Sequence, residues 1–170
     1  MAHSVELLFD PATEARIREL WAALTEAGLA APPQTARPHV TLTVAEHLDP
    51  GVDAALGEVA ARLPLPARIG APLLFGRSRL VLVRLIVPTA ELLEVHAATD
   101  RLARPYLRPA PMPTAVPGRW TAHTTLARRV RPDRLAAALP IAARPAELAA
   151  TFTGLRRWDG DRRVEFPVPS

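Results

Sequence analysis

The spacing of apolar residues changes from segment to segment, and these changes predict an ordered series of strands and helices. The run from Val5 to Phe9 is short and apolar, which is typical of a strand. Asp10 and Pro11 then suit an N-cap and a first helical position, and apolar positions in residues 11–27 recur with a helical period before Gly28. We therefore expect a strand and a helix, from which a proline-rich connector, APPQTARP, leads to a second apolar strand.

The rest of the chain also passes between short apolar runs, helical periods and prolines. The expected elements are a helix over about 53–63, hairpin strands at about 67–75 and 80–87, a helix at about 89–102, an extended proline-rich loop at 105–118, a strand around 123, a helix at about 132–139, and a closing hairpin at about 149–157 and 162–168. The order strand, helix, proline-rich connector, strand occurs twice, so we expect two related halves of an α+β fold. A length of 170 residues suits one domain over residues 1–170.

Two of the expected strands carry one short pattern, HVTL beginning at His39 and HTTL beginning at His123. Alternate side chains of a strand share a face, so each histidine projects together with the threonine two residues later, Thr41 or Thr125. Two such strands side by side would give one site two imidazoles and two hydroxyls. Imidazoles can take a proton from water and give one to a leaving oxygen, and hydroxyls can donate to phosphate oxygens. The pair therefore predicts cleavage of a phosphodiester and leaves open which histidine is the acid.

The composition narrows the class of protein. The chain has no cysteine, which excludes disulfide frameworks, thiolate zinc sites and cysteine nucleophiles. It has no apolar run of the roughly 20 residues that a membrane-spanning helix needs, and its start, MAHSVELLFD, lacks a signal-peptide pattern. The net charge is only +4, and all 21 basic residues are arginine, whose planar fork suits phosphate. We expect a cytoplasmic protein that neither enters membranes nor grips long nucleic acids by charge alone.

Other kinds of active site find little support. Two histidines with two threonines lack the third strong ligand of catalytic zinc, and no HExxH motif is present. The chain also lacks GxGxxG, Walker and GxSxG sequences, so we expect no metal, no nucleotide cofactor and no serine nucleophile. We expect structural or solvated roles for His3, His47 and His96. A purely structural role for His39 and His123 is the alternative to catalysis.

Arginine and aromatic residues near the motifs indicate how a substrate would bind. Arg37 and Arg119 precede the two histidines by two and four residues, a strand-like spacing that places them at the edges of the same site. Trp120 follows Arg119, and Tyr106 lies near Arg108. Aromatic stacking on a base, with arginine on phosphate, is a common way to bind nucleotides. The alternative is that Trp120 packs in the core and the arginines form a solvated surface.

At the two motifs the chain resembles the 2H phosphoesterase superfamily, and within it the bacterial 2′-5′ RNA ligase-like proteins and RNA 2′,3′-cyclic phosphodiesterases. The resemblance extends from SVELLFDP to the C-terminal hairpin. It implies a bilobal α+β fold in which two pseudo-symmetric, antiparallel-rich sheets with flanking helices form a central cleft. It also implies acid and base roles for the two histidines and contacts of the two threonines with non-bridging phosphate oxygens, without a metal.

Two further positions are compared with the family pattern. Arg128 matches an arginine that often follows the second motif and contacts phosphate, although strand parity places it on the face of Thr124. Members often open with an Arg-x-Phe type of first strand, whereas this chain has VELLF at 5–9. The resemblance implies hydrolysis of a 2′,3′-cyclic or 2′-5′ phosphodiester, in an RNA end or a nucleotide, and its reversal as 2′-5′ RNA ligation. We expect a monomer. The alternative function is a nucleotide- or RNA-binding module that has lost useful catalysis.

Overall fold

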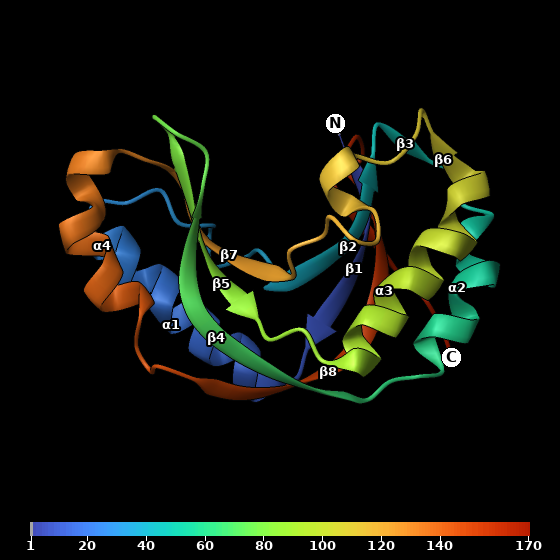
Figure 1. Cartoon of the computed structure of the whole chain (residues 1–170), viewed down its shortest axis with the longest axis horizontal. Helices are drawn as coiled ribbons and strands as arrows, with labels where there is room; N and C mark the ends of the chain where they lie inside the picture. Colours follow the sequence, from blue (N-terminus) through green and yellow to red (C-terminus); the bar gives the residue numbers. More distant parts are fainter. Residues whose placement is uncertain (1) are drawn as a thin grey trace.

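Both halves of the chain contribute strands to one antiparallel sheet in the computed structural model, which describes residues 2–170 (Figure 1). The strands are β1 His3–Phe9, β2 His39–Ala45, β4 Leu65–Phe75, β5 Leu80–Ile86, β7 His123–Val130, β8 Leu148–Asp159 and β9 Val164–Pro167. Their order is β2-β1-β8-β4-β5-β7, with β9 paired to β8. A second sheet pairs β3 His47–Leu48 with β6 Leu107–Arg108.

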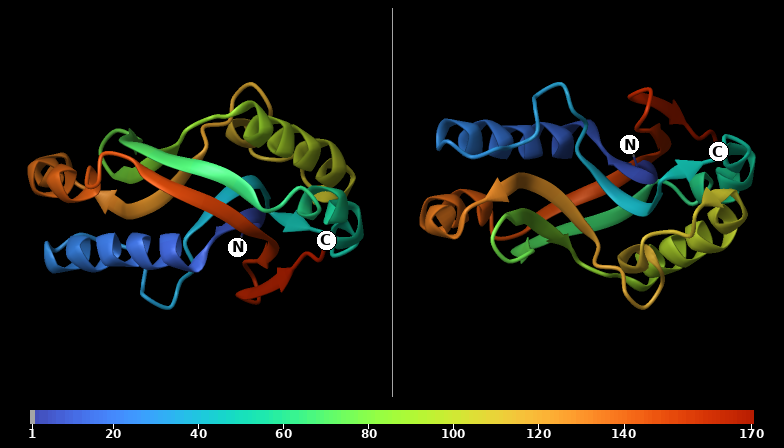
Figure 2. Two further views of the ribbon diagram at one scale, coloured as in Figure 1. Left: turned by 90° about the horizontal axis from the view of Figure 1, so that it is seen from below. Right: turned by 90° about the horizontal axis from the view of Figure 1, so that it is seen from above.

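The helices cover one face of the large sheet in two pairs. They are α1 Pro11–Glu26, α2 Val52–Ala60, α3 Ala90–Ala103 and α4 Leu135–Ala142, and single 3₁₀ turns occupy Arg104–Tyr106, Pro113–Ala115 and Pro132–Arg134. Helix α1 packs with α4 near β7 and β5, and α2 packs with α3 near β2 and β8 (Figures 1 and 2). No helix of residues 2–170 is long and apolar enough to cross a membrane.

Two helices begin where a side chain caps their first turn. The Asp10 carboxylate accepts a hydrogen bond from the Thr13 amide at 2.9 Å and another from the Thr151 amide at 2.9 Å, so it caps α1 and ties it to β8. The Thr89 hydroxyl accepts from the Leu92 amide at 3.2 Å at the start of α3. Both residues satisfy donors that a helix leaves unpaired in its first turn.

Several element boundaries differ from those that the sequence predicts, and three of these differences have a clear structural cause. Strand β4 begins at Leu65 rather than at 67 and contains Pro66, because pairing of residues 65–69 with β8 extends it. The expected extended loop at 105–118 includes β6, which pairs with β3 through only two residues. Helix α4 follows a 3₁₀ turn at its expected start and continues to Ala142. Such short tertiary pairings are invisible to local patterns, since partners far apart in sequence determine them.

The two motif strands show the alternation that their sequences predict. In β2, Val40 and Leu42 are buried against the helices, whereas His39 and Thr41 are half-buried. In β7 the buried positions are 124 and 126, and the half-buried positions are His123 and Thr125. One face of each motif strand therefore contributes to the core, and the opposite face carries the motif side chains.

The sheet brings together two strands that are far apart in its hydrogen-bonding order. Strands β2 and β7 end the path β2-β1-β8-β4-β5-β7, yet they contact each other because the sheet curls (Figure 1). Each motif strand pairs with the strand that opens its half of the chain, β2 with β1 and β7 with β5. The repeated order of elements thus places the two motifs at matching positions.

Candidate active site

The two histidines have matching hydrogen bonds at one ring nitrogen. Nδ1 of His39 lies 2.8 Å from the Arg37 carbonyl oxygen, and Nδ1 of His123 lies 2.7 Å from the Thr121 carbonyl oxygen. A carbonyl oxygen can only accept, so each Nδ1 carries the proton and donates it. The arrangement leaves Nε2 of both rings for proton transfer, the tautomer that two-histidine acid-base chemistry requires.

The threonine hydroxyls of the motifs have no protein partner among residues 2–170. No hydrogen bond within this part of the chain involves Oγ1 of Thr41 or Oγ1 of Thr125, and both side chains are half-buried. A hydroxyl can donate one hydrogen bond and accept two. Both threonines therefore retain a donor for a substrate oxygen on the face that carries the histidines.

Each motif strand is anchored by a tryptophan that belongs to the other half of the repeated pattern. The Trp120 indole, which precedes the second motif, donates to the Thr41 carbonyl at 3.0 Å. The Trp21 indole, in α1, donates to the Thr125 carbonyl at 2.9 Å. The ring of Trp120 also stacks on His96, with centroids 3.9 Å apart and planes 1° apart. One face of Trp120 is thus covered by protein, and its indole connects the two motifs.

We expect Trp120→Phe to lower the free energy of unfolding by about 1–3 kcal/mol, because it removes a hydrogen bond and leaves the Thr41 carbonyl without a donor. Urea unfolding monitored by circular dichroism measures this loss. The matched control is Trp158→Phe, since no indole hydrogen bond of Trp158 exists within the described residues. An equal or larger loss in the control would contradict the anchoring role of Trp120.

The surroundings of the two histidines differ at one equivalent position. Glu6 of β1 pairs with Thr41, and Val83 of β5 pairs with Thr125 in the same place of the other half. Oε1 of Glu6 lies 3.5 Å from Nε2 of His39. The first motif therefore has a carboxylate beside its free ring nitrogen, whereas the equivalent residue in the second half is a fully buried valine.

Glu6 belongs to a network of alternating charges. Its Oε2 accepts from Nε of Arg156 at 2.8 Å, and Arg156 also reaches Glu165 at 2.6 Å. Arg37 lies 3.6 Å from Glu165 and 3.0 Å from Glu14. Burial opposes the charge of Arg156, but the carboxylates of Glu6 and Glu165 outweigh it and raise the pKa of Arg156. The network fixes the Glu6 carboxylate where it meets His39.

His123 has a more apolar environment. The Phe75 ring meets it edge-on with centroids 4.9 Å apart. Burial lowers the pKa of His123, and the positive charges of His39 and Arg128 lower it further, while the bond to the Thr121 carbonyl acts in the opposite direction. His123 is thus suited to accept a proton at neutral pH.

This shift predicts a pH dependence. A base must be unprotonated, so the acidic limb of kcat/KM should lie below the pH of about 6.5 expected for a free imidazole. We expect Arg128→Gln to move this limb to higher pH, because it removes a positive charge that lowers the pKa of His123. The control is Arg129→Gln at the next position, which is also exposed. Equal shifts in both variants, or no shift with Arg128→Gln, would contradict the interpretation.

The residues that we expected to bind substrate differ in whether they interact with the motifs and in whether their side chains already have protein partners. Arg37 uses its side chain in ion pairs and its carbonyl to orient His39. Arg119 is exposed, and no hydrogen bond or ion pair of its side chain exists within residues 2–170. Tyr106 packs against the core beside Gly51, and within residues 2–170 no hydrogen bond, ion pair or ring contact joins it to either motif. Trp120 contacts the first motif through its indole, as described above.

The expectation that Arg128 lies on the same face of the strand as Thr124 is wrong. Register shifts between β5 and β7 on either side of Leu82 interrupt the alternation after Thr125, so positions beyond that point no longer follow it. Arg128 is exposed, and its charge reaches His123. Its amide donates to the Ala30 carbonyl at 2.9 Å, which fixes the backbone at this irregular point.

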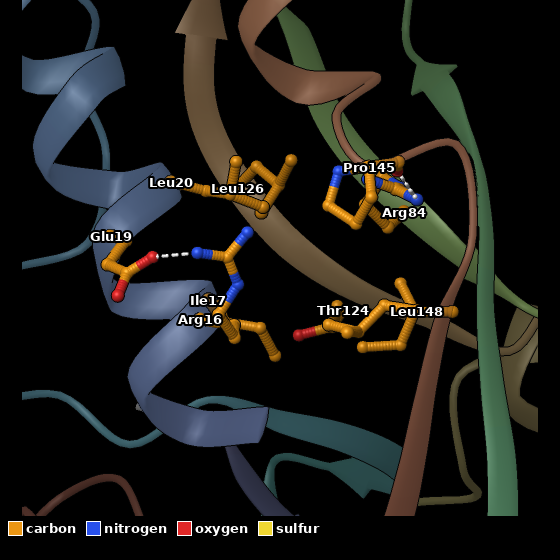
Figure 3. Close-up of a pocket in the computed structure, with 10 residues that line it drawn as sticks. Arg16, Ile17, Glu19, Leu20, Arg84, Thr124, Leu126, Pro145 and Leu148 are labelled. Carbon is orange, nitrogen blue, oxygen red and sulfur yellow. Dashed lines mark hydrogen bonds and ion pairs between the residues drawn. The ribbon is translucent and has the colours of Figure 1, made fainter. Parts of the chain in front are cut away.

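Other polar groups lie away from the motifs. Thr124 faces a cavity of about 100 Å³ between α1 and the far side of β7, which Figure 3 shows with Arg16 and Leu148 at its wall. Of the residues described, one group brings three possible metal ligands within 4.8 Å of one another: His3, Asp159 and Asp161. His3 pairs with Ala45, six residues along β2 from His39. The cavity and this group are therefore separate from the two-histidine face.

Comparison with known proteins identifies the family of the chain and several similar folds. The family model of the 2′-5′ RNA ligase superfamily matches residues 9–163. TT0787 of Thermus thermophilus is a similar solved structure, with TM-score 0.63, 20% identity, and coverage of 99% of this chain and 95% of that chain. LigT of E. coli in complex with 3′-AMP has TM-score 0.57, 16% identity, and coverage of 99% and 93%. The MHV ns2 PDE domain has TM-score 0.56, 18% identity, and coverage of 92% and 96%. No curated protein matches the chain. These similarities confirm the expected α+β fold class.

Proposed function

The chain belongs to the 2′-5′ RNA ligase superfamily of two-histidine phosphoesterases, and on this premise we propose that it hydrolyses 2′,3′-cyclic phosphodiesters of RNA ends or nucleotides. The observation that carries the proposal is the matching pair of motifs, in which both histidines direct Nδ1 to a backbone carbonyl and keep Nε2 for chemistry. The complex of the similar LigT with 3′-AMP supports a ribose phosphate as the bound group.

The proposed reaction needs two proton transfers and one substitution at phosphorus. One imidazole takes a proton from water while the water oxygen bonds to phosphorus. The bond from phosphorus to one ribose oxygen breaks, and the other imidazole gives that oxygen its proton. Hydroxyls of Thr41 and Thr125 donate to the non-bridging oxygens as their charge grows. With a 5′-hydroxyl in place of water, the same transfers would form a 2′-5′ linkage between RNA ends.

We also propose that residues 1–170 act as one domain and as a monomer, because one chain supplies both motifs. The sheet that carries them is continuous from β2 to β7. A site that is complete within one chain needs no contribution from a second copy.

The test is turnover of a nucleoside 2′,3′-cyclic monophosphate, and of a short RNA with a 2′,3′-cyclic end, in the presence of EDTA. We expect a phosphomonoester product, detected by ³¹P NMR, and a rate that chelation does not change. Tight nucleotide binding without turnover at any pH would contradict the proposal and favour a binding module.

A further inference from the structure

A cavity of about 100 Å³ lies behind the second motif strand, on the face of β7 opposite His123 and Thr125. Helix α1 covers it, and the strands β4, β5, β7 and β8 form its other walls (Figure 3). Most of the lining is apolar and comes from Ile17, Leu20, Ile69, Leu126, Pro145 and Leu148. Two buried polar residues, Arg84 and Thr124, line the same space.

The hydroxyl of Thr124 is buried in this wall and has no hydrogen-bond partner within residues 2–170. Only 1% of Thr124 is exposed, and in Figure 3 its hydroxyl points toward α1, into the cavity. A buried hydroxyl without a partner is rare, because the hydrogen bonds that it makes to water in the unfolded chain are lost without replacement. A molecule in the cavity would supply the missing partner.

Arg84 adds a positive charge beside this hydroxyl. It pairs with Thr124 across β5 and β7, so the two side chains share a face of the sheet. Four of its five N–H donors bond to carbonyl oxygens, those of Gly70, Ala142, Pro145 and Ala146. The fifth, on Nη1, has no acceptor in the described part of the chain, and no carboxylate there lies within ion-pair distance. Burial lowers the pKa of Arg84, but a guanidinium stays charged at neutral pH. The wall thus holds a buried charge without a counter-ion.

The size and lining of the cavity suit a small amphiphilic molecule better than water. A water molecule takes up about 30 Å³ in the liquid and needs two to four polar partners when it is buried. The cavity has room for about three waters, but its buried polar groups, Thr124 and Arg84, can serve only one of them. A cavity of about 150 Å³ holds benzene, so this smaller one suits a molecule of about four or five non-hydrogen atoms.

We propose that this cavity is a binding site for a short aliphatic carboxylate, of the size of propionate. The carboxylate accepts hydrogen bonds from the Thr124 hydroxyl and from the remaining N–H of Arg84, whose charge it balances, and the alkyl group packs against the leucines of the wall. Arg16 and Glu19, the exposed residues of the lining, form an ion pair on α1. An exposed ion pair is weak, so it can open to let the ligand enter. The site lies behind the two-histidine face and does not depend on the proposed function.

The test is titration of the wild-type protein with propionate, followed by methyl ¹H–¹³C NMR. We expect saturable shifts with a dissociation constant on the order of 1 mM, which is within the limit for a ligand of five non-hydrogen atoms. Intermolecular NOEs should join the propionate protons to the methyl groups of Leu126 and Leu148. Propionamide has the same shape without the charge and should bind at least about 10-fold more weakly, because hydrogen bonds to a charged group are stronger.

Two threonine variants show whether the buried hydroxyl contributes. Thr124→Val keeps the side-chain shape and should weaken propionate binding by about 10-fold, because it removes one donor to the carboxylate. The matched control is Thr43→Val, since Thr43 of β2 also has a buried hydroxyl without a partner in residues 2–170 but does not line this cavity. It should leave the dissociation constant unchanged. Equal weakening in the two variants, or equal binding of propionate and propionamide, would overturn the inference. So would the absence of these NOEs at about ten times the expected dissociation constant, which would mean that the cavity holds only water.

Discussion

Replacing either His39 or His123 by alanine should lower kcat for a nucleoside 2′,3′-cyclic phosphate by about 10²- to 10⁴-fold, because each imidazole makes one of two obligatory proton transfers. The two rings present the same free nitrogen, and β2 and β7 bring them together from the two ends of the sheet. Loss of either transfer disables the reaction, so the double variant should be little slower than the worse single variant. Initial rates at saturating substrate measure these losses.

The control for the histidine variants is His47→Ala. His47 is exposed in β3 and outside both motifs. Its replacement should leave kcat unchanged, and circular dichroism should show that all three variants keep their secondary structure. Full activity of His39→Ala or of His123→Ala would contradict a shared two-histidine mechanism.

The second large effect is expected for the motif threonines. Thr41→Val and Thr125→Val keep the branched shape and remove a hydroxyl that has no protein partner within residues 2–170. Removal of one donor to a developing oxyanion typically costs about 10²- to 10³-fold in kcat. We expect losses of this order in kcat and smaller changes in KM, because the donation strengthens as charge develops on the phosphate oxygens.

Thr124→Val is the matched control for the threonine variants. It changes the same residue type one position before Thr125, on the opposite face of β7 and toward the cavity of Figure 3. Its kcat should remain within about threefold of the wild type, since it contacts neither motif face. A loss as large as that of Thr125→Val would indicate that the effect comes from strand packing rather than from phosphate contact.

Much of the local structure could be predicted from sequence because it depends on neighbours in the chain. Alternation in β2 and β7 follows from the period of two, and the capped starts of α1 and α3 follow from Asp10 and Thr89. The face shared by each histidine and its threonine is a consequence of the same period. These features needed no knowledge of partner strands.

The remaining features depend on contacts between distant segments. The curl of the sheet brings β2 and β7 together, and no local pattern specifies it. The anchoring role of Trp21 depends on a strand more than 100 positions away, and the irregular register at Arg128 depends on β5. Glu6 did leave a signal, a single charge within the apolar run SVELLF, but its link to His39 required the pairing of β1 with β2.

A crystal structure with bound inorganic phosphate or a 3′-nucleotide would show whether both motifs bind one phosphate group. We predict a phosphorus atom between the two histidines, with phosphate oxygens within hydrogen-bonding distance of both Nε2 atoms and of the hydroxyls of Thr41 and Thr125. A phosphate that reaches only one of the two motifs, or that binds elsewhere while both histidines stay free, would contradict it.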